Sequence, residues 1–117
     1  MSNSTADVLQ HHLEAFGNGD LAAILSDYSD DSILVTPETT LRGPAEMGPF
    51  FEGLFADFAT PGTSFAMKTQ TVEGEIAYIV WTAETGDNVY ELGTDTFLVR
   101  DGKIAVQTYA AKIRRKS

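Results

Sequence analysis

Two side chains in this sequence of 117 residues are the main candidates for moving protons. His12 stands four residues after Val8 and four before Phe16, so on a helix the three share one apolar face. Imidazole titrates near neutral pH, so His12 could shuttle a proton or donate a hydrogen bond. The alternative is a partly buried helix histidine that bonds a carbonyl. His11 points in another direction and is expected to face solvent.

The second candidate is Asp95, in a predicted strand over residues 89–99. It alternates with Gly93 and Phe97, whereas the opposite face carries Tyr90, Leu92, Thr94, Thr96 and Leu98. Neither face is strongly polar, so the alternation leaves the direction of Asp95 open. In an apolar hollow, desolvation would raise its pKa, and it could act as an acid or donate a hydrogen bond to a developing oxyanion. On the outer face it would be an exposed carboxylate.

Several kinds of chemistry lack the residues they need. The sequence has no cysteine, which excludes disulfides, thiolate metal sites and cysteine nucleophiles. Its two histidines are adjacent and differ by about 100° in direction on a helix, so they do not form a multi-histidine metal site. No calcium-loop spacing, phosphate-binding glycine motif or serine-hydrolase motif is present. We therefore expect no metal and no cofactor.

Apolar residues at helical spacing predict three helices that precede most of the strands. The first begins at Ser4, which with Asp7 has the spacing of a capping box, and stops at Gly17. The second begins at Asp20 and includes Tyr28. After a short strand over 32–36 and a loop over 38–42, the third helix opens at Gly43 and Pro44. Its apolar stripe consists of Met47, Phe50, Phe51, Leu54, Phe55 and Phe58.

The chain after residue 63 reads as an antiparallel meander. Strands are predicted over 64–73, 76–85, 89–99 and 104–112, separated by glycine-containing turns. Three helices and one curved sheet indicate an α+β layer fold with a hollow between its layers. Strand residues of one parity could line that hollow or fill a plain core: Phe65, Met67, Ile79, Trp81, Phe97 and Tyr109.

The length and composition of the chain limit the classes of partner that it can bind. The length predicts a single domain over 1–117. The formal net charge of −9 makes binding to nucleic acid improbable. No apolar run is long enough to cross a membrane, and the N-terminus has neither the basic start nor the apolar stretch of a signal peptide. We therefore expect a cytoplasmic protein that binds neither membranes nor nucleic acid.

Three blocks carry a resemblance to a known family: FGNGDLAAILSDYSDDSILVTP, LRGPAEMGPFFEGL and GTDTFLVRDGKIAVQTYAAK. In these blocks the chain resembles the NTF2-like superfamily, which includes ketosteroid isomerases and SnoaL-like polyketide cyclases. The resemblance implies a cone in which three N-terminal helices pack on a curved, mostly antiparallel sheet that encloses a pocket. It also implies a homodimer through the outer face of the sheet.

The catalytic positions of ketosteroid isomerases transfer only in part. Their carboxylate base ends the first strand just before a proline, where this chain has Thr36 before Pro37, so the base is missing unless Glu38 replaces it. The resemblance places their oxyanion tyrosine at His12 and their protonated aspartate at Asp95. SnoaL-like cyclases often carry an acid after a tyrosine of the final strand, and that acid is absent here.

Two functions remain open. The first is an isomerase, cyclase or dehydratase that acts on a small apolar carbonyl compound, with Asp95 as acid or base and His12 as its partner. The second is a non-catalytic domain that binds a ligand or a protein through the same cavity or sheet, which the threonine in the base position favours. In either case the candidate substrate-binding residues are Thr36, Phe55, Trp81, Phe97 and Tyr109.

Overall fold

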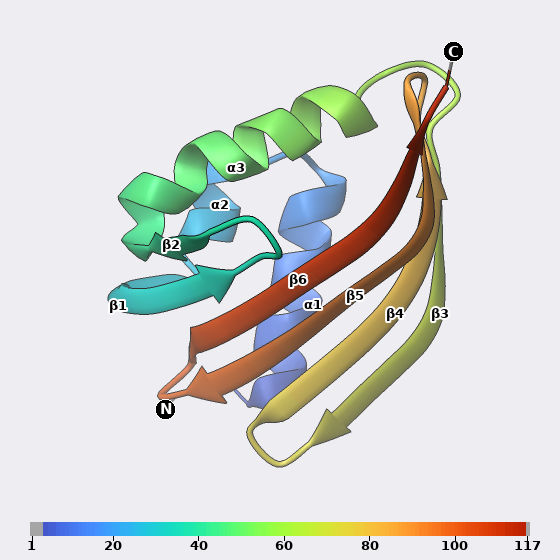
Figure 1. The fold of residues 1–117 in the computed structure, drawn as a ribbon. Coiled ribbons are helices and arrows are strands. Elements are labelled where there is room, and N and C mark those ends of the chain that lie inside the picture. Colours follow the sequence, from blue (N-terminus) through green and yellow to red (C-terminus); the bar gives the residue numbers. More distant parts are fainter. Residues whose placement is uncertain (1–3, 117) are drawn as a thin grey trace.

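The computed structural model describes residues 4–116. Residues 1–3, at the start of the N-terminal segment that lacks a signal-peptide pattern, lie outside the described residues, as does Ser117. Figure 1 shows three helices on one side of a curved sheet. The helices are α1 (Thr5–Gly17), α2 (Leu21–Leu25) and α3 (Gly43–Phe58). The strands are β1 (Tyr28–Val35), β2 (Thr40–Arg42), β3 (Ser64–Glu73), β4 (Ile76–Glu84), β5 (Asn88–Arg100) and β6 (Lys103–Arg115).

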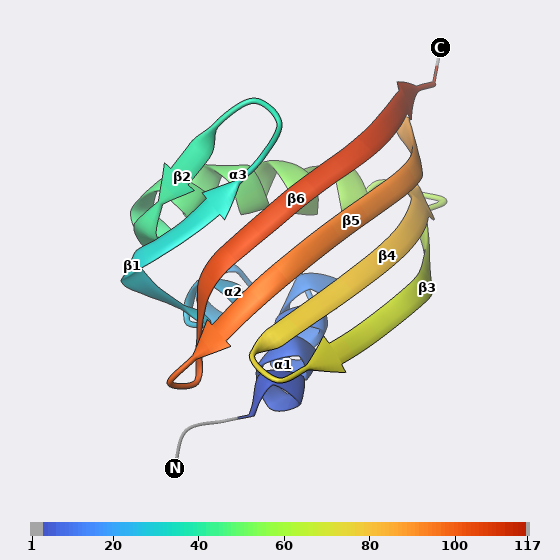
Figure 2. The ribbon, with the colours of Figure 1, turned by 60° about the horizontal axis from the view of Figure 1, so that its bottom comes forward.

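The six strands form one sheet in the order β2-β1-β6-β5-β4-β3. Every neighbouring pair is antiparallel except β1 and β6, which run parallel. In Figure 2 the long strands β3 to β6 bend together, and the helices lie behind them against one face. The predicted α+β fold with a curved sheet is thus confirmed. As the sequence pattern predicts, α3 follows a strand, so the three helices implied by the resemblance are not all N-terminal to the sheet.

The start of α1 follows directly from its sequence. The Ser4 hydroxyl accepts a hydrogen bond from the Asp7 backbone, and the Asp7 carboxylate accepts one from the Ser4 backbone. This is the predicted capping box. The buried face of the helix consists of Val8, Leu9, His12 and Ala15.

The second helix is shorter than predicted. Tyr28 does not continue it but begins β1, where it pairs with Ile104 of β6 and is buried. The strand pairing and the burial of the ring override a spacing that suits a helix equally well. The predicted loop over 38–42 likewise contains β2, which pairs with Ile33–Val35 of β1.

A bulge in β5 corrects the predicted facing of one residue. The pairing with β6 shifts register between Tyr90 and Leu92. Such a bulge turns the residue before it to the other face. Tyr90 therefore lies on the helix-covered face with Asp95 and is buried, whereas the alternation predicts that it lies with Leu92 on the face opposite Asp95. Over residues 4–116, no helix combines the length and apolar character that a membrane crossing requires.

Candidate functional site

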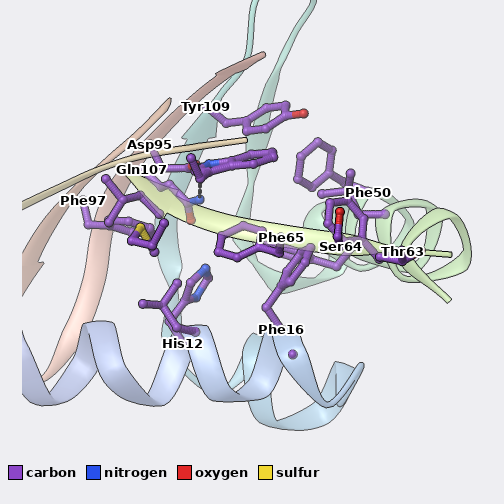
Figure 3. A pocket seen from close by; sticks show the side chains of 18 residues that line it. His12, Phe16, Phe50, Thr63, Ser64, Phe65, Asp95, Phe97, Gln107 and Tyr109 are labelled. Atoms are coloured by element: carbon purple, nitrogen blue, oxygen red, sulfur yellow. Dashed lines mark hydrogen bonds between the residues drawn. The ribbon is translucent and has the colours of Figure 1, made fainter. Parts of the chain in front are cut away.

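A pocket of about 380 Å³ lies between the helices and the covered face of the sheet (Figure 3). This volume is at the lower end of the range usual for small-molecule sites. Most of its described lining is apolar or aromatic, and that lining contains no lysine or arginine. The helices contribute His12, Leu13, Phe16, Gly17, Phe50, Phe51, Leu54 and Phe58. The sheet and the segment before it contribute Thr63, Ser64, Phe65, Met67, Ile79, Trp81, Asp95, Phe97, Gln107 and Tyr109.

Asp95 is the carboxyl group of this pocket, and it is only 7% exposed. Trp81 donates its indole N–H to Oδ1 at 2.8 Å, and Gln107 donates its amide N–H to Oδ2 at 2.9 Å. Burial raises the pKa of Asp95, while these two hydrogen bonds and the nearby His12 ring lower it. Because burial is the largest effect, the carboxylate accepts a proton more readily than an exposed aspartate does.

A second layer of bonding fixes the orientation of Gln107. The buried Tyr28 hydroxyl donates to Gln107 Oε1, which leaves the amide nitrogen to face Asp95. Burial, together with the charges of Asp27 and Asp95, raises the pKa of Tyr28 well above 10, so its hydroxyl remains protonated at neutral pH. Tyr28, Gln107, Asp95 and Trp81 therefore form one hydrogen-bonded network, in which Asp95 accepts from Gln107 on one side and from Trp81 on the other.

Trp81 reaches Asp95 because residue 93 is a glycine. The indole lies directly against Gly93, where an added Cβ would be 2.3 Å from ring atoms Cε2 and Cζ2. The ring also stacks on Phe65 and Tyr109, with ring-centre distances of 5.6 and 6.5 Å. Burial raises the pKa of Tyr109 to about 12, so its hydroxyl is a further hydrogen-bond donor at the pocket wall.

His12 projects from α1 into the pocket, on the wall opposite Asp95 (Figure 3), and is 4% exposed. Its ring meets the rings of Tyr28, Phe51 and Phe97 edge to face. Within residues 4–116, Nδ1 makes no hydrogen bond, so the alternative of a helix histidine bonded through Nδ1 to a carbonyl does not hold. The polar atom opposite Nδ1 is Oδ2 of Asp27, at 3.4 Å.

The structure brings some of the predicted site residues together and not others. Trp81, Phe97 and Tyr109 line the pocket with Asp95 and His12. The alternation in β5 left the direction of Asp95 open, and the packing of α1 and α3 on this face decides it.

Two predicted binding residues lie elsewhere. Phe55 packs against Phe16 and Phe51 and does not line the pocket. Thr36 also lies outside the lining, because its hydroxyl accepts the backbone N–H groups of Glu38 and Thr39 in the turn after β1. Glu38 is exposed and does not take the missing base position.

Three polar residues of the site were not predicted. Gln107 could have been found, because it alternates with Tyr109 on the last strand and is a polar residue on an otherwise apolar face. Tyr28 and Asp27 gave no such signal, since the sequence pattern assigned them to the second helix or its end. Within residues 4–116 no three carboxylates or imidazoles cluster in a way that could hold a metal ion.

Comparison with known proteins gives a family and a fold. The model of the SnoaL-like domain family matches residues 9–107. No curated protein sequence matches.

Solved structures extend the likeness to nearly the whole fold. An NTF2-like protein of unknown function from Cytophaga hutchinsonii superposes with a TM-score of 0.77 at 10% identity, covering 96% of this chain and 93% of that one. An LEH-like epoxide hydrolase from M. tuberculosis gives 0.70 at 15% identity, covering 92% and 82%. A de novo designed protein with a curved β-sheet gives 0.76 at 17% identity, covering 92% and 84%. Identities this low establish a shared fold, and one fold can support unrelated functions.

Proposed function

The chain belongs to the SnoaL-like domain family of the NTF2-like superfamily, and we propose that its pocket binds a small apolar carbonyl compound on which Asp95 and His12 move a proton. The observation that carries the proposal is the setting of Asp95. It is a desolvated carboxyl group, held by two N–H donors, in a pocket that is otherwise mostly apolar. Perturbed carboxyl groups in such pockets are typical of acid–base sites.

The reaction requires two groups that transfer protons, one on each of two opposite walls of the pocket. Asp95 takes a proton from the carbon next to the carbonyl, and the electron pair of that C–H bond becomes a carbon–carbon double bond. The carbonyl oxygen takes a proton from the protonated His12 ring, so the ligand becomes a neutral enol. In the return step, neutral His12 takes back the O–H proton of the enol while Asp95 delivers a proton to carbon. Return to the same carbon exchanges its hydrogen once the Asp95 proton has exchanged with solvent, and return to a conjugated carbon isomerises the ligand. A positioned acid or base contributes about 10²–10⁴-fold to such a step.

Trp81 provides the binding assay, because it is the only tryptophan and lines the pocket. Its fluorescence would be followed during titration with 2-cyclohexenone and α-tetralone. The same ketones in D2O would be examined by mass spectrometry for deuterium next to the carbonyl. We expect saturable binding and protein-dependent exchange, with exchange reduced about 10²–10⁴-fold in Asp95→Asn.

The control is Thr96→Ser, the next residue on β5, which faces away from the pocket. This variant should bind and exchange like the wild type. Exchange that persists at full rate in Asp95→Asn would remove the carboxyl group from the mechanism.

One observation favours a second candidate, a domain that binds its ligand without reaction. The position that carries the base in ketosteroid isomerases holds Thr36, and its hydroxyl is engaged in a turn. Saturable quenching of Trp81 by a ketone with no deuterium exchange in the wild type would select this function over catalysis.

We also propose that the partner of the protein is a second copy of itself. Across β4, β5 and β6, the outer sheet face contains three neighbouring cross-strand rows of uncharged side chains: Tyr78, Thr96 and Thr108; Val80, Thr94 and Ala110; Ile76, Leu98 and Val106. Two chains of formal charge −9 repel, so they would meet most easily over this uncharged area. Non-denaturing mass spectrometry at low micromolar concentration should show two chains, and a single chain would contradict the proposal.

A further inference from the structure

Asp27 lies between the two adjacent histidines of α1, behind the pocket. It stands in the short connection from α2 to β1 and is 7% exposed. Its Oδ1 is 2.6 Å from Nδ1 of His11, whose side chain is 48% exposed. Its Oδ2 faces Nδ1 of the buried His12. Since residues 11 and 12 point in different directions from the helix, one carboxylate contacts an outer and an inner imidazole.

The contact with His12 is the one left unsatisfied. Nδ1 of His12 and Oδ2 of Asp27 are both buried, and neither has a hydrogen-bond partner within residues 4–116. They are 3.4 Å apart, which is slightly long for a hydrogen bond. Hydrogen bonds at catalytic groups are often long in unliganded structures and shorten when a ligand binds. A small rotation of either side chain would satisfy both atoms at once.

Backbone hydrogen bonds hold Asp27 at a position from which its carboxylate can reach His12. Its N–H bonds the carbonyl of Ile24 at 3.2 Å, and its carbonyl accepts the N–H of Ile104 on β6 at 2.7 Å. His11 holds the other carboxylate oxygen. The carboxylate is therefore fixed from the backbone and from one oxygen, and its second oxygen is directed at His12.

We propose that Asp27 is a positioning residue for His12: it holds a proton on Nδ1, so that the ring gains and loses its other proton only at Nε2. This inference deepens the proposed function and rests on it for its catalytic meaning. With Nδ1–H bound to a carboxylate, neutral His12 presents an acceptor at Nε2 and charged His12 presents a donor there. A carboxylate in this position fixes the tautomer of the ring and stabilises the imidazolium without taking its proton.

The direct test is the tautomer of His12, measured by long-range ¹H–¹⁵N NMR on protein labelled with ¹⁵N-histidine. In the wild type, with the His12 ring in its neutral form, we expect the remaining ring proton on Nδ1. In Asp27→Asn the amide can donate to Nδ1, so the proton should move to Nε2. Asp31→Asn is the matched control, because it makes the same substitution at an exposed position of β1 outside the pocket lining, and His12 should keep its proton on Nδ1.

The second readout is the deuterium exchange of α-tetralone described above. Exchange should fall by about 10-fold or more in Asp27→Asn and stay near the wild-type rate in Asp31→Asn. A wild-type His12 with its proton on Nε2 overturns the proposal without any variant, even if Asp27→Asn fails to fold. An unchanged tautomer in folded Asp27→Asn overturns it as well. Absence of exchange in the wild type, with the tautomer as expected, refutes the proposed reaction and leaves the positioning role standing.

Discussion

Replacing Gly93 with alanine should distort the site, because the added methyl group meets the Trp81 ring. The new Cβ would lie 2.3 Å from two atoms of the Trp81 indole, well inside contact distance, so the ring must move. Moving it breaks the 2.8 Å bond from its N–H to Asp95 and leaves one buried carboxylate oxygen without a donor. Overpacking costs about 1–3 kcal/mol, and a lost hydrogen bond to a charged group costs about 1.5–3 kcal/mol. We therefore expect Gly93→Ala to lower the free energy of unfolding by about 2.5–6 kcal/mol.

The measurement is urea unfolding followed by far-ultraviolet circular dichroism, with Trp81 fluorescence recorded on the native protein. The matched control is Gly53→Ala, at an exposed position of α3 where an added Cβ meets no atom within 4 Å. That variant should be more stable by up to about 1 kcal/mol, because alanine is the better helix former. A Gly93→Ala protein with wild-type stability and unchanged Trp81 emission would refute the close approach of the indole to β5.

Three further predictions concern single side chains. Asp95→Asn should lower stability by about 1–3 kcal/mol in thermal unfolding at pH 8, because an amide nitrogen in place of one carboxylate oxygen faces the N–H donor of Trp81 or Gln107. Burial raises the pKa of Asp95, so the folded state holds this proton more tightly than the unfolded state does; wild-type stability therefore rises as pH falls through that raised pKa, and the deficit of the variant should grow toward pH 3.8. Asp57→Ala should cost about 1–3 kcal/mol at pH 7 in urea unfolding, because the carboxylate accepts from Thr85, Asn88 and Tyr90. Burial raises the pKa of Asp57, but the three hydrogen bonds together lower it by more, so the net pKa lies below 3.8. The stability deficit of Asp57→Ala should therefore shrink as pH falls below 3.8, and a deficit that stays constant down to pH 2 would contradict this. Tyr78→Glu, at a 39% exposed position of the outer sheet face, should convert the proposed dimer to a monomer by light scattering while ketone binding is kept.

Much of the fold could be predicted because it depends on local patterns. The Ser4–Asp7 cap and the apolar stripes fixed α1 and α3, and the turns at Gly74 and Gly102 separated strands whose alternation is regular. Errors came where a local pattern suits two structures. Tyr28 has helical spacing from Leu21, yet it pairs in a strand.

The sequence by itself determined which chemical groups are available to the pocket: one apolar strand parity, a histidine on the buried stripe of α1, and an aspartate on β5. Only the tertiary structure decided which of these groups meet. The direction of Asp95 depends on which sheet face the helices cover, and the direction of Tyr90 depends on a bulge that strict alternation does not contain. The bonds from Gln107 to Asp95 and the contact of Asp27 with His12 join residues from separate elements. Contacts of this kind leave no periodic trace in a single sequence, because their partners are brought together by packing and not by spacing along the chain.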